Sequence, residues 1–261
     1  MSKKALAFSL AFALTGFAAA QAATPPAAKP TVVLVHGAFA DSSSWDGVVA
    51  DLRRDGYPVV SAANPLRGAA NDAAAVRTVI NSIPGPVVLV GHSYGGTVIS
   101  AAADGAANVK ALVYVAAFAP EVGESTFDLT GKFPGSTLPA ALDKPVDLPG
   151  GVHDLYIQQD KFPAQFAADV PLAKAQLMAI AQRPLTDAAG GEKAVSAAWK
   201  TIPSWWVWGG GDRNIPPAAM AWMADRAHAK QVVTVPGASH VVMISHPHAV
   251  SALIETAAKA Q

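Results

Sequence analysis

The sequence predicts an α/β protein in which a mostly parallel central sheet is flanked by helices. Apolar runs rich in β-branched residues, such as 31–36 and 87–92, are typical of strands buried on both faces. Segments with apolar residues at helical spacing, such as 45–55, alternate with these runs along the chain. Because parallel neighbours need long crossover connections, which are usually helical, the alternation predicts a parallel sheet with helices on both faces.

The expected elements follow one another in a regular order, interrupted once. Before the interruption, strands are expected at 31–36, 59–62, 87–92 and 110–117, and helices at 45–55, 72–83 and 95–107. After it, a strand at 204–208, a helix at 217–227, a strand at 231–235 and a helix at 247–260 complete the pattern.

The interruption, about 120–201, holds many prolines and glycines and no strong strand. Modest helical patterns occur at 155–166 and 172–182. A long insertion between two core strands is expected to form a cap over the site. A structural excursion without a substrate role is the alternative.

Composition narrows the class of protein. The 261 residues are 51% hydrophobic and 15% charged, which suits one well-buried domain. With 19 basic and 19 acidic side chains the formal net charge is zero, so nothing steers the protein toward nucleic acid or anionic lipid, and a small neutral substrate fits. The chain has no cysteine, which excludes a disulfide framework, thiolate chemistry and a cysteine-bound metal.

The first residues predict export. Lys3 and Lys4, the apolar run that follows and the small residues up to Ala22 are the three regions of a secretory signal peptide. The run is shorter than the ~20 residues needed to span a bilayer, so removal after Ala22 is expected and no stable membrane anchor remains. The mature protein would be periplasmic or secreted. The expected organisation is a signal peptide at 1–22, a flexible leader at 23–30 and one domain at 31–261 with its cap at about 120–201.

Ser93 is the candidate nucleophile. It ends the apolar run 87–92, is bracketed by Gly91 and Gly95, and precedes an Ala-rich helical segment. A serine on such a sharp strand-to-helix turn is held in a strained backbone conformation with its hydroxyl exposed, an arrangement called a nucleophile elbow. The two glycines fit because any Cβ there would collide with the neighbouring turn. A plain turn between strand and helix is the alternative.

Position along the chain identifies a base and an acid. A serine hydroxyl is a poor nucleophile at neutral pH, so Ser93 needs a base and a third group that orients this base. His240 lies in a loop directly after a predicted core strand, and Asp212 follows another core strand through a triple-glycine turn. Both are therefore expected at the carboxyl edge of the sheet, where the ligand sites of open α/β sheets collect. The remaining histidines suit structural, capping or cap positions: His36, His92, His153, His228, His246 and His248.

Backbone N–H groups are expected to bind the oxyanion of a tetrahedral intermediate. The N–H of Tyr94, directly after the nucleophile, is one candidate. The loop after the first strand is expected to supply the second through Ala38 or Phe39, with Phe39 preferred. Gly37 would let the chain turn tightly there, or it simply ends the strand.

These motifs resemble the α/β-hydrolase superfamily, and more narrowly its cofactor-free branch of small carboxylesterases, plant methyl esterases and hydroxynitrile lyases. The motifs are LVHGAF at 34–39 with Trp45, GHSYGG at 91–96, GD at 211–212 with IP at 215–216, and SH at 239–240 with MISHP at 243–247. The resemblance covers about 31–258, strongly in the core and poorly in the cap. It implies an α/β-hydrolase fold with an inserted cap, no cofactor, a triad in the chain order Ser93, Asp212, His240, and hydrolysis of small carboxylic esters through an acyl-enzyme.

Other activities of the same fold are alternatives. The hydroxynitrile lyases similar to this sequence carry a lysine directly after the catalytic histidine, whereas this chain has Val241, which disfavours lyase chemistry. Perhydrolases share the serine triad, and a non-catalytic protein that binds a small ligand on a hydrolase scaffold is a further alternative. Four aromatic side chains are expected either to line an apolar substrate pocket or to form the core of the cap. They are Phe118, Phe127, Phe133 and Phe162.

Overall fold

The computed structural model describes residues 28–260 together with Met1. The predicted signal peptide, apart from Met1, and residues 23–27 of the predicted leader lie outside the described residues.

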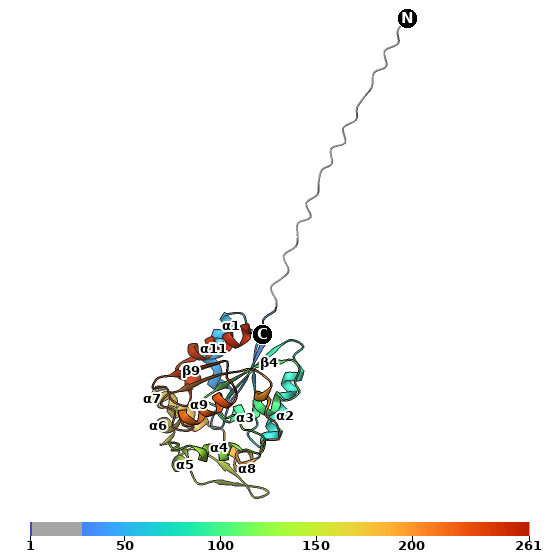
Figure 1. Ribbon diagram of the computed structural model, residues 1–261. Coiled ribbons are helices and arrows are strands. Elements are labelled where there is room, and N and C mark those ends of the chain that lie inside the picture. Colours follow the sequence, from blue (N-terminus) through green and yellow to red (C-terminus); the bar gives the residue numbers. More distant parts are fainter. Residues whose placement is uncertain (2–27, 261) are drawn as a thin grey trace.

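Within residues 28–260, six strands form a parallel sheet in the order β2-β1-β3-β4-β8-β9 (Figure 1). They are β1 (Thr31–Val35), β2 (Val59–Ala62), β3 (Val87–His92), β4 (Val109–Val115), β8 (Ser204–Gly209) and β9 (Gln231–Val235). Every residue of β3 and β8 is buried, as expected for strands covered on both faces. The predicted parallel sheet is confirmed, and because all strands run the same way their carboxyl ends share one edge.

Helices cover both faces of this sheet. Two of them, α1 (Asp46–Arg54) and α11 (Pro247–Lys259), pack together on one face, and α2 (Ala69–Asn81) packs beside α3 (Tyr94–Ala102) on the other (Figure 1). The helix α9 (Pro217–Arg226) lies against β8. A short 3-10 helix, η1 (Ser42–Trp45), leads into α1, and a one-turn helix, α10 (Val242–Ser245), precedes α11. This arrangement is the predicted one, with helix ends shifted by a few residues.

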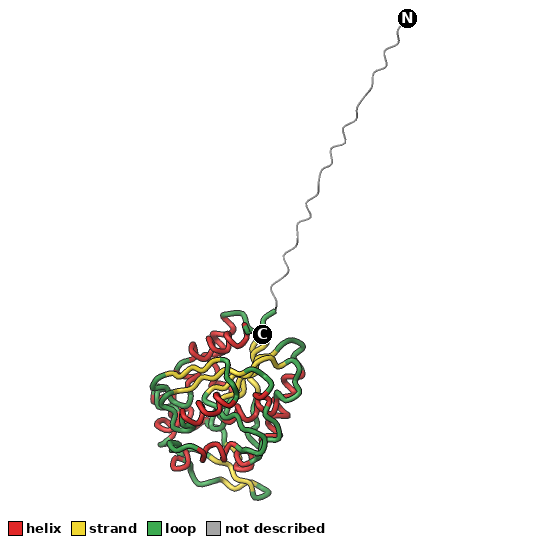
Figure 2. Tube along the Cα trace, viewed as in Figure 1, coloured by secondary structure: helices red, strands yellow, loops and turns green. Residues whose placement is uncertain are grey.

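The insertion between β4 and β8 differs in part from the prediction. It contains a small antiparallel sheet in the order β5-β6-β7, visible in yellow at the lower end of Figure 2, where no strong strand was expected. These strands have only two to four residues, too few for an alternating pattern to be recognised. The elements of the insertion are α4 (Thr126–Lys132), α5 (Leu138–Ala141), β5 (Val146–Leu148), β6 (Val152–Leu155), α6 (Phe162–Phe166), α7 (Leu172–Ala181), β7 (Leu185–Thr186), α8 (Asp187–Gly191) and η2 (Ala198–Lys200).

One predicted helix of the insertion is wrong in its first half. The segment 155–166 was expected to be helical throughout, but Leu155 ends β6 and only the last turn, α6, is helical. The backbone of β6 pairs with β5 on one side and β7 on the other, and this pairing outweighs the local helical spacing. The other predicted helix, at 172–182, is confirmed as α7.

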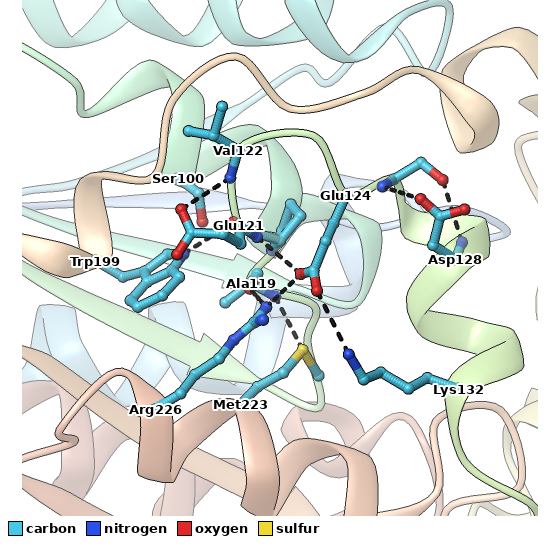
Figure 3. Close-up of polar contacts among 12 residues, drawn as sticks. Ser100, Ala119, Glu121, Val122, Glu124, Asp128, Lys132, Trp199, Met223 and Arg226 are labelled. Atoms are coloured by element: carbon cyan, nitrogen blue, oxygen red, sulfur yellow. Dashed lines mark hydrogen bonds and ion pairs between the residues drawn. The ribbon is translucent and has the colours of Figure 1, made fainter.

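The start of the insertion is anchored to the core through Arg226 at the end of α9. Its guanidinium donates to the carbonyl oxygen of Ala119 and, over 2.8 Å, to Glu124 (Figure 3). The indole N–H of Trp199, at the other end of the insertion, donates to the carbonyl oxygen of Pro120 over 2.9 Å. Both ends of the insertion are thus tied to one another and to a core helix.

No helix among the described residues has the length and apolar character that crossing a bilayer requires.

Candidate active site

Ser93 lies on a strained turn between β3 and α3. Its φ is 54° and its ψ is −124°, a conformation that residues other than glycine rarely adopt. A Cβ on Gly91 would approach the carbonyl oxygen of Gly95 to 2.6 Å, and one on Gly95 would approach the carbonyl oxygen of Val35 to the same distance. The predicted steric need for both glycines is therefore confirmed, and the backbone geometry is that of a nucleophile elbow.

Asp212 and His240 form a buried hydrogen-bonded pair. His240 Nδ1 and Asp212 Oδ2 are 2.7 Å apart, and the two side chains are 1% and 0% exposed. The other carboxylate oxygen accepts the backbone N–H groups of Asn214 over 2.8 Å and Ile215 over 3.0 Å. Because these donors hold Oδ1, Oδ2 is left to accept a proton from Nδ1, which places the lone pair of the imidazole on Nε2.

The Nε2 atom of His240 is buried and has no hydrogen-bond partner among the described residues. The ring of His92, the residue directly before Ser93, lies 4.8 Å from the His240 ring, centroid to centroid. His92 Nε2 is 3.1 Å from the carbonyl oxygen of His240. Ser93 ends β3, Asp212 follows β8 and His240 follows β9, so all three stand at the carboxyl edge of the sheet. The three predicted residues thus share one edge of the sheet.

His36 and His92 are fully buried at the carboxyl edge of the sheet. His36 Nδ1 lies 3.0 Å from the carbonyl oxygen of Gly37 and must donate to it, so Nε2 is free to accept the N–H of Asn64 over 3.2 Å. Burial lowers the pKa of His36 and lowers that of His92 well below its ordinary value. Both rings are therefore neutral at physiological pH, as befits structural rather than catalytic histidines.

Three further histidines pair with carboxylates, and one of them, His246, lies 3.5 Å from Asp169 with its side chain 43% exposed. His248 pairs with Asp51, between α11 and α1, and its side chain is 81% exposed. His153 pairs with Asp187 in the insertion and is 40% exposed. In all three pairs the histidine is exposed to water, in contrast to the buried His240.

The hydrogen bonds of the loop after β1 correct the preferred second oxyanion donor. The N–H of Phe39 donates to the carbonyl oxygen of Arg183 over 2.8 Å, so it is already engaged. The N–H of Ala38 has no partner among the described residues. The loop lies against the nucleophile, because a Cβ on Gly37 would come within 2.6 Å of the Ser93 Cβ. Of the two candidates, Ala38 is the one with a free donor beside Ser93. The N–H of Tyr94 is likewise free, as the first N–H of α3.

Ser93 faces a cavity of about 110 Å³ between the sheet edge and the insertion. Its lining is almost entirely apolar and includes residues of the loop after β1 and of the insertion. Of the four phenylalanines considered from the sequence, Phe118 and Phe127 line the cavity, whereas Phe133 and Phe162 pack against other aromatic side chains. The insertion therefore covers the site, as expected of a cap.

Within residues 28–260, no three histidine, aspartate or glutamate side chains are grouped as a metal site requires.

Comparison with known proteins identifies the family. Residues 32–253 match the profile of the alpha/beta hydrolase family. The chain belongs to this family. It is 34% identical over 134 residues to the carbendazim hydrolyzing esterase of Nocardioides sp. (strain SG-4G), a match that covers 43% of this chain and 55% of the relative. It therefore spans about half the length of that esterase. It is also 27% identical over 252 residues to the alpha-hydroxynitrile lyase of Arabidopsis thaliana, with 84% of this chain and 93% of the lyase covered.

Solved structures share the fold of this chain. The structure of polyneuridine aldehyde esterase superposes with a TM-score of 0.75 at 19% identity, covering 87% of this chain and 98% of the esterase. At that identity the likeness shows the fold, an α/β-hydrolase fold with a six-stranded parallel sheet in the described residues and a small antiparallel insert.

Several residues of the candidate site were not recognised from the sequence. Phe166 contacts the ring of His240 at 5.1 Å and Arg183 engages the loop after β1, and both come from the insertion, where no motif marks them. Asn214 lines the cavity two residues after Asp212. Its closeness to a predicted triad residue was the one available signal.

Proposed function

We propose that this hydrolase cleaves small carboxylic esters through an acyl-enzyme intermediate on Ser93. The observation that carries the proposal is the buried Asp212–His240 pair, whose free Nε2 stands at the same sheet edge as a strained serine. The relationship to an esterase supports the same chemistry. The apolar cavity beside the serine suits a small uncharged substrate.

In the acylation step, Ser93 Oγ attacks the ester carbonyl carbon while His240 Nε2 takes the hydroxyl proton. The new C–O bond forms as the carbonyl π bond breaks, so negative charge moves to the carbonyl oxygen. The N–H groups of Tyr94 and Ala38 are the donors proposed for this oxyanion, assisted by the positive end of α3. When the intermediate collapses, the bond to the alcohol oxygen breaks and His240 returns the proton to the leaving alcohol.

In the deacylation step, water attacks the acyl carbon and His240 accepts a proton from it. The Ser93 ester bond then breaks, and the same proton goes to Ser93 Oγ, which releases the carboxylic acid. Asp212 keeps the proton on Nδ1 throughout and stabilises the imidazolium that forms in both steps.

The residue after the base favours hydrolysis over hydroxynitrile cleavage. Val241 is fully buried and apolar, so this position offers no cation for a cyanide leaving group. A perhydrolase would use the same acyl-enzyme with hydrogen peroxide in place of water. Adding peroxide to the ester assay and measuring the peracid separates the two: hydrolysis predicts carboxylic acid as the main product.

The test of the proposal is the hydrolysis of p-nitrophenyl acetate by wild type and by Ser93→Ala. We expect Ser93→Ala to lose turnover and labelling by a fluorophosphonate, while its circular dichroism spectrum and melting temperature match those of wild type. Ser82→Ala, at an exposed serine, is the matched control and should keep full activity. Turnover retained by Ser93→Ala would overturn the assignment, and ligand binding by wild type without turnover or labelling would favour a non-catalytic binding protein.

We also propose that the protein is exported and that residues 1–22 are removed. The charged start, the apolar run and the small residues before Ala23 support this. Expression of the full chain in a bacterium, cell fractionation and intact mass measurement test it. A periplasmic or secreted product that begins at Ala23 is expected, and a full-length product confined to the cytoplasm would contradict export.

A further inference from the structure

Apart from Ser93 itself, one side chain that lines the cavity, Asn214, has a donor nitrogen without a hydrogen-bond partner among the described residues. Asn214 is 3% exposed and lines the cavity. Its Oδ1 accepts a hydrogen bond of 2.7 Å from Gln165 Nε2. Its Nδ2 has no partner among the described residues.

The orientation of the Asn214 amide follows from its neighbours. Gln165 donates from the same Nε2 to the carbonyl oxygen of Arg213 over 3.0 Å, and a carbonyl oxygen can only accept. This identifies the Gln165 atom as the nitrogen. The side-chain atom of Asn214 that faces it must then be an acceptor, which is Oδ1. Thr137 Oγ1, 2.7 Å from Gln165 Oε1, completes the chain of contacts. The NH2 group of Asn214 is therefore held away from Gln165.

The other polar side chains that line the cavity are accounted for. Tyr94 donates its hydroxyl to Asp72 over 2.8 Å. Thr126 Oγ1 lies 2.9 Å from the hydroxyl of a neighbouring threonine, and Thr130 donates to the carbonyl oxygen of Thr126 over 2.9 Å. Apart from Ser93 and the hydroxyl pair of Thr97 and Thr126, in which either oxygen can be the donor, Asn214 Nδ2 is the one side-chain donor of the described lining that is left for a ligand.

We propose that Asn214 determines substrate specificity by donating a hydrogen bond from Nδ2 to a substrate oxygen outside the reacting ester group. The preferred substrates of the protein are then esters with an apolar body and one neutral hydrogen-bond acceptor, such as an ether, keto or hydroxyl oxygen. A neutral acceptor is favoured over a carboxylate because the described lining contains no cationic side chain to compensate a buried negative charge. This inference rests on the ester hydrolysis proposed above.

The experiment compares two series of p-nitrophenyl esters of equal chain length. In one series the acyl chain is all carbon, and in the other an ether oxygen replaces each CH2 group in turn. The ratio of kcat/KM between an ether ester and its carbon analogue is measured for wild type and for Asn214→Leu, which removes the donor at similar volume. Dividing the two ratios cancels the intrinsic reactivity of the esters.

At one position of the ether oxygen in the acyl chain, we expect the ratio of kcat/KM to be about 3- to 10-fold higher in wild type than in Asn214→Leu. A factor of this size is what one hydrogen bond supplies. Asn214→Ala, which cannot clash with its surroundings, should lose the same preference. Thr130→Val removes a hydroxyl that is already paired and should leave the ratio unchanged. Equal rates of fluorophosphonate labelling at Ser93 show that the variants keep an intact triad.

The outcomes separate this inference from the proposed function. Suppose that ester hydrolysis depends on Ser93 but that the ratio of kcat/KM between ether and carbon esters is the same in wild type and in both Asn214 variants, at every position of the ether oxygen. This result overturns the role of Asn214 and leaves the proposed function intact. Absence of ester hydrolysis by wild type overturns both. A preference that Thr130→Val abolishes as well would also overturn the assignment to Asn214.

Discussion

The Nε2 atom of His92 lies 3.1 Å from the backbone carbonyl oxygen of His240, and the two rings are in contact. A carbonyl oxygen can only accept, so this nitrogen of His92 carries the proton. The residue directly before the proposed nucleophile thus holds the backbone of the proposed base. This contact joins the elbow after β3 to the loop after β9, which are 148 residues apart in the chain.

Removal of this donor should disturb catalysis without touching the reacting groups. We expect His92→Phe to lower kcat at least 10-fold with KM changed by less than about 2-fold, because small displacements of a base are costly. The unpaired carbonyl should also cost about 1–3 kcal/mol of stability. His92→Gln, which retains a donor, should recover much of kcat. Ester kinetics and urea unfolding measure both effects, and full kcat in His92→Phe would show that the contact has no positioning role.

The buried histidines also predict a stability that falls in mild acid. Burial lowers the pKa values of His36 and His92, so between pH 6.5 and their folded values the unfolded chain binds more protons than the folded one. Their contribution is complete above pH 6.5 and is lost as the pH falls, by up to about 1.4 kcal/mol per pH unit for each ring. Urea unfolding from pH 8 to pH 4.5 should show this slope, and His92→Gln should reduce it. Parallel curves for the two proteins would contradict the role of His92.

The core and the three proposed catalytic residues could be predicted from sequence because their signals are local. A strand buried on both faces, such as β3, is a continuous apolar run, and the turn that follows it needs glycine at positions 91 and 95 for steric reasons. Asp212 and His240 each follow a core strand directly, so the parallel arrangement alone brings them to one edge.

The remainder of the site depends on contacts that no local pattern records. The loop donor shifted from Phe39 to Ala38 because the carbonyl oxygen of Arg183, 144 residues later, engages Phe39. The orientation of Asn214 is set by Gln165 of α6 in the insertion. Short strands and single turns in the insertion take their conformation from such distant partners. The residues of the insertion that line the cavity therefore could not be predicted from the local sequence.

Asp212→Asn should cause a large loss of activity while the fold is kept. The N–H groups of Asn214 and Ile215 require an acceptor at one oxygen position, so the new amide nitrogen would face His240 Nδ1. That arrangement forces the proton onto Nε2, where it cannot act as a base. We expect kcat/KM to fall about 10³- to 10⁴-fold, with a melting temperature within a few degrees of wild type. Asp160→Asn, at an exposed aspartate, is the control, and retention of a tenth or more of the activity in Asp212→Asn would contradict the proposed role.

Gly96 should be far less tolerant of a side chain than Gly131. A Cβ on Gly96 would lie 2.2 Å from the carbonyl oxygen of Phe118, so the backbone beside the cavity would have to move. We expect Gly96→Ala to cost at least about 2 kcal/mol of stability. Gly131, in α4, has nothing within 4 Å of its Cβ position, and Gly131→Ala should be neutral or stabilise by about 0.4–1 kcal/mol. Thermal unfolding of both variants is the measurement, and equal effects would contradict the packing described for α3.

Arg226 should contribute stability that depends on the charge of Glu124. The guanidinium bridges Glu124 and the carbonyl oxygen of Ala119 (Figure 3). It also lies over the ring of Trp222, 4.2 Å from the ring centroid. Arg226→Met keeps the apolar stem but leaves both acceptors without their donor. We expect a loss of about 2–4 kcal/mol at pH 7, measured by urea unfolding.

The pH dependence of this loss distinguishes the ion pair from packing. Burial opposes ionisation of Glu124, but hydrogen bonds from Arg226 and from the Glu121 N–H outweigh it and lower the pKa of Glu124 below its ordinary 4.5. The contribution of a carboxylate with a lowered pKa is present above pH 4.5 and is lost as the pH falls through its folded value. The difference between wild type and Arg226→Met should therefore shrink between pH 5 and pH 3.5. In the Glu124→Gln background, the loss of stability caused by Arg226→Met should be smaller than in the wild-type background. It should also not change between pH 5 and pH 3.5. A difference that stays constant with pH in the wild-type background would assign the loss to the contacts with Ala119 and Trp222 instead.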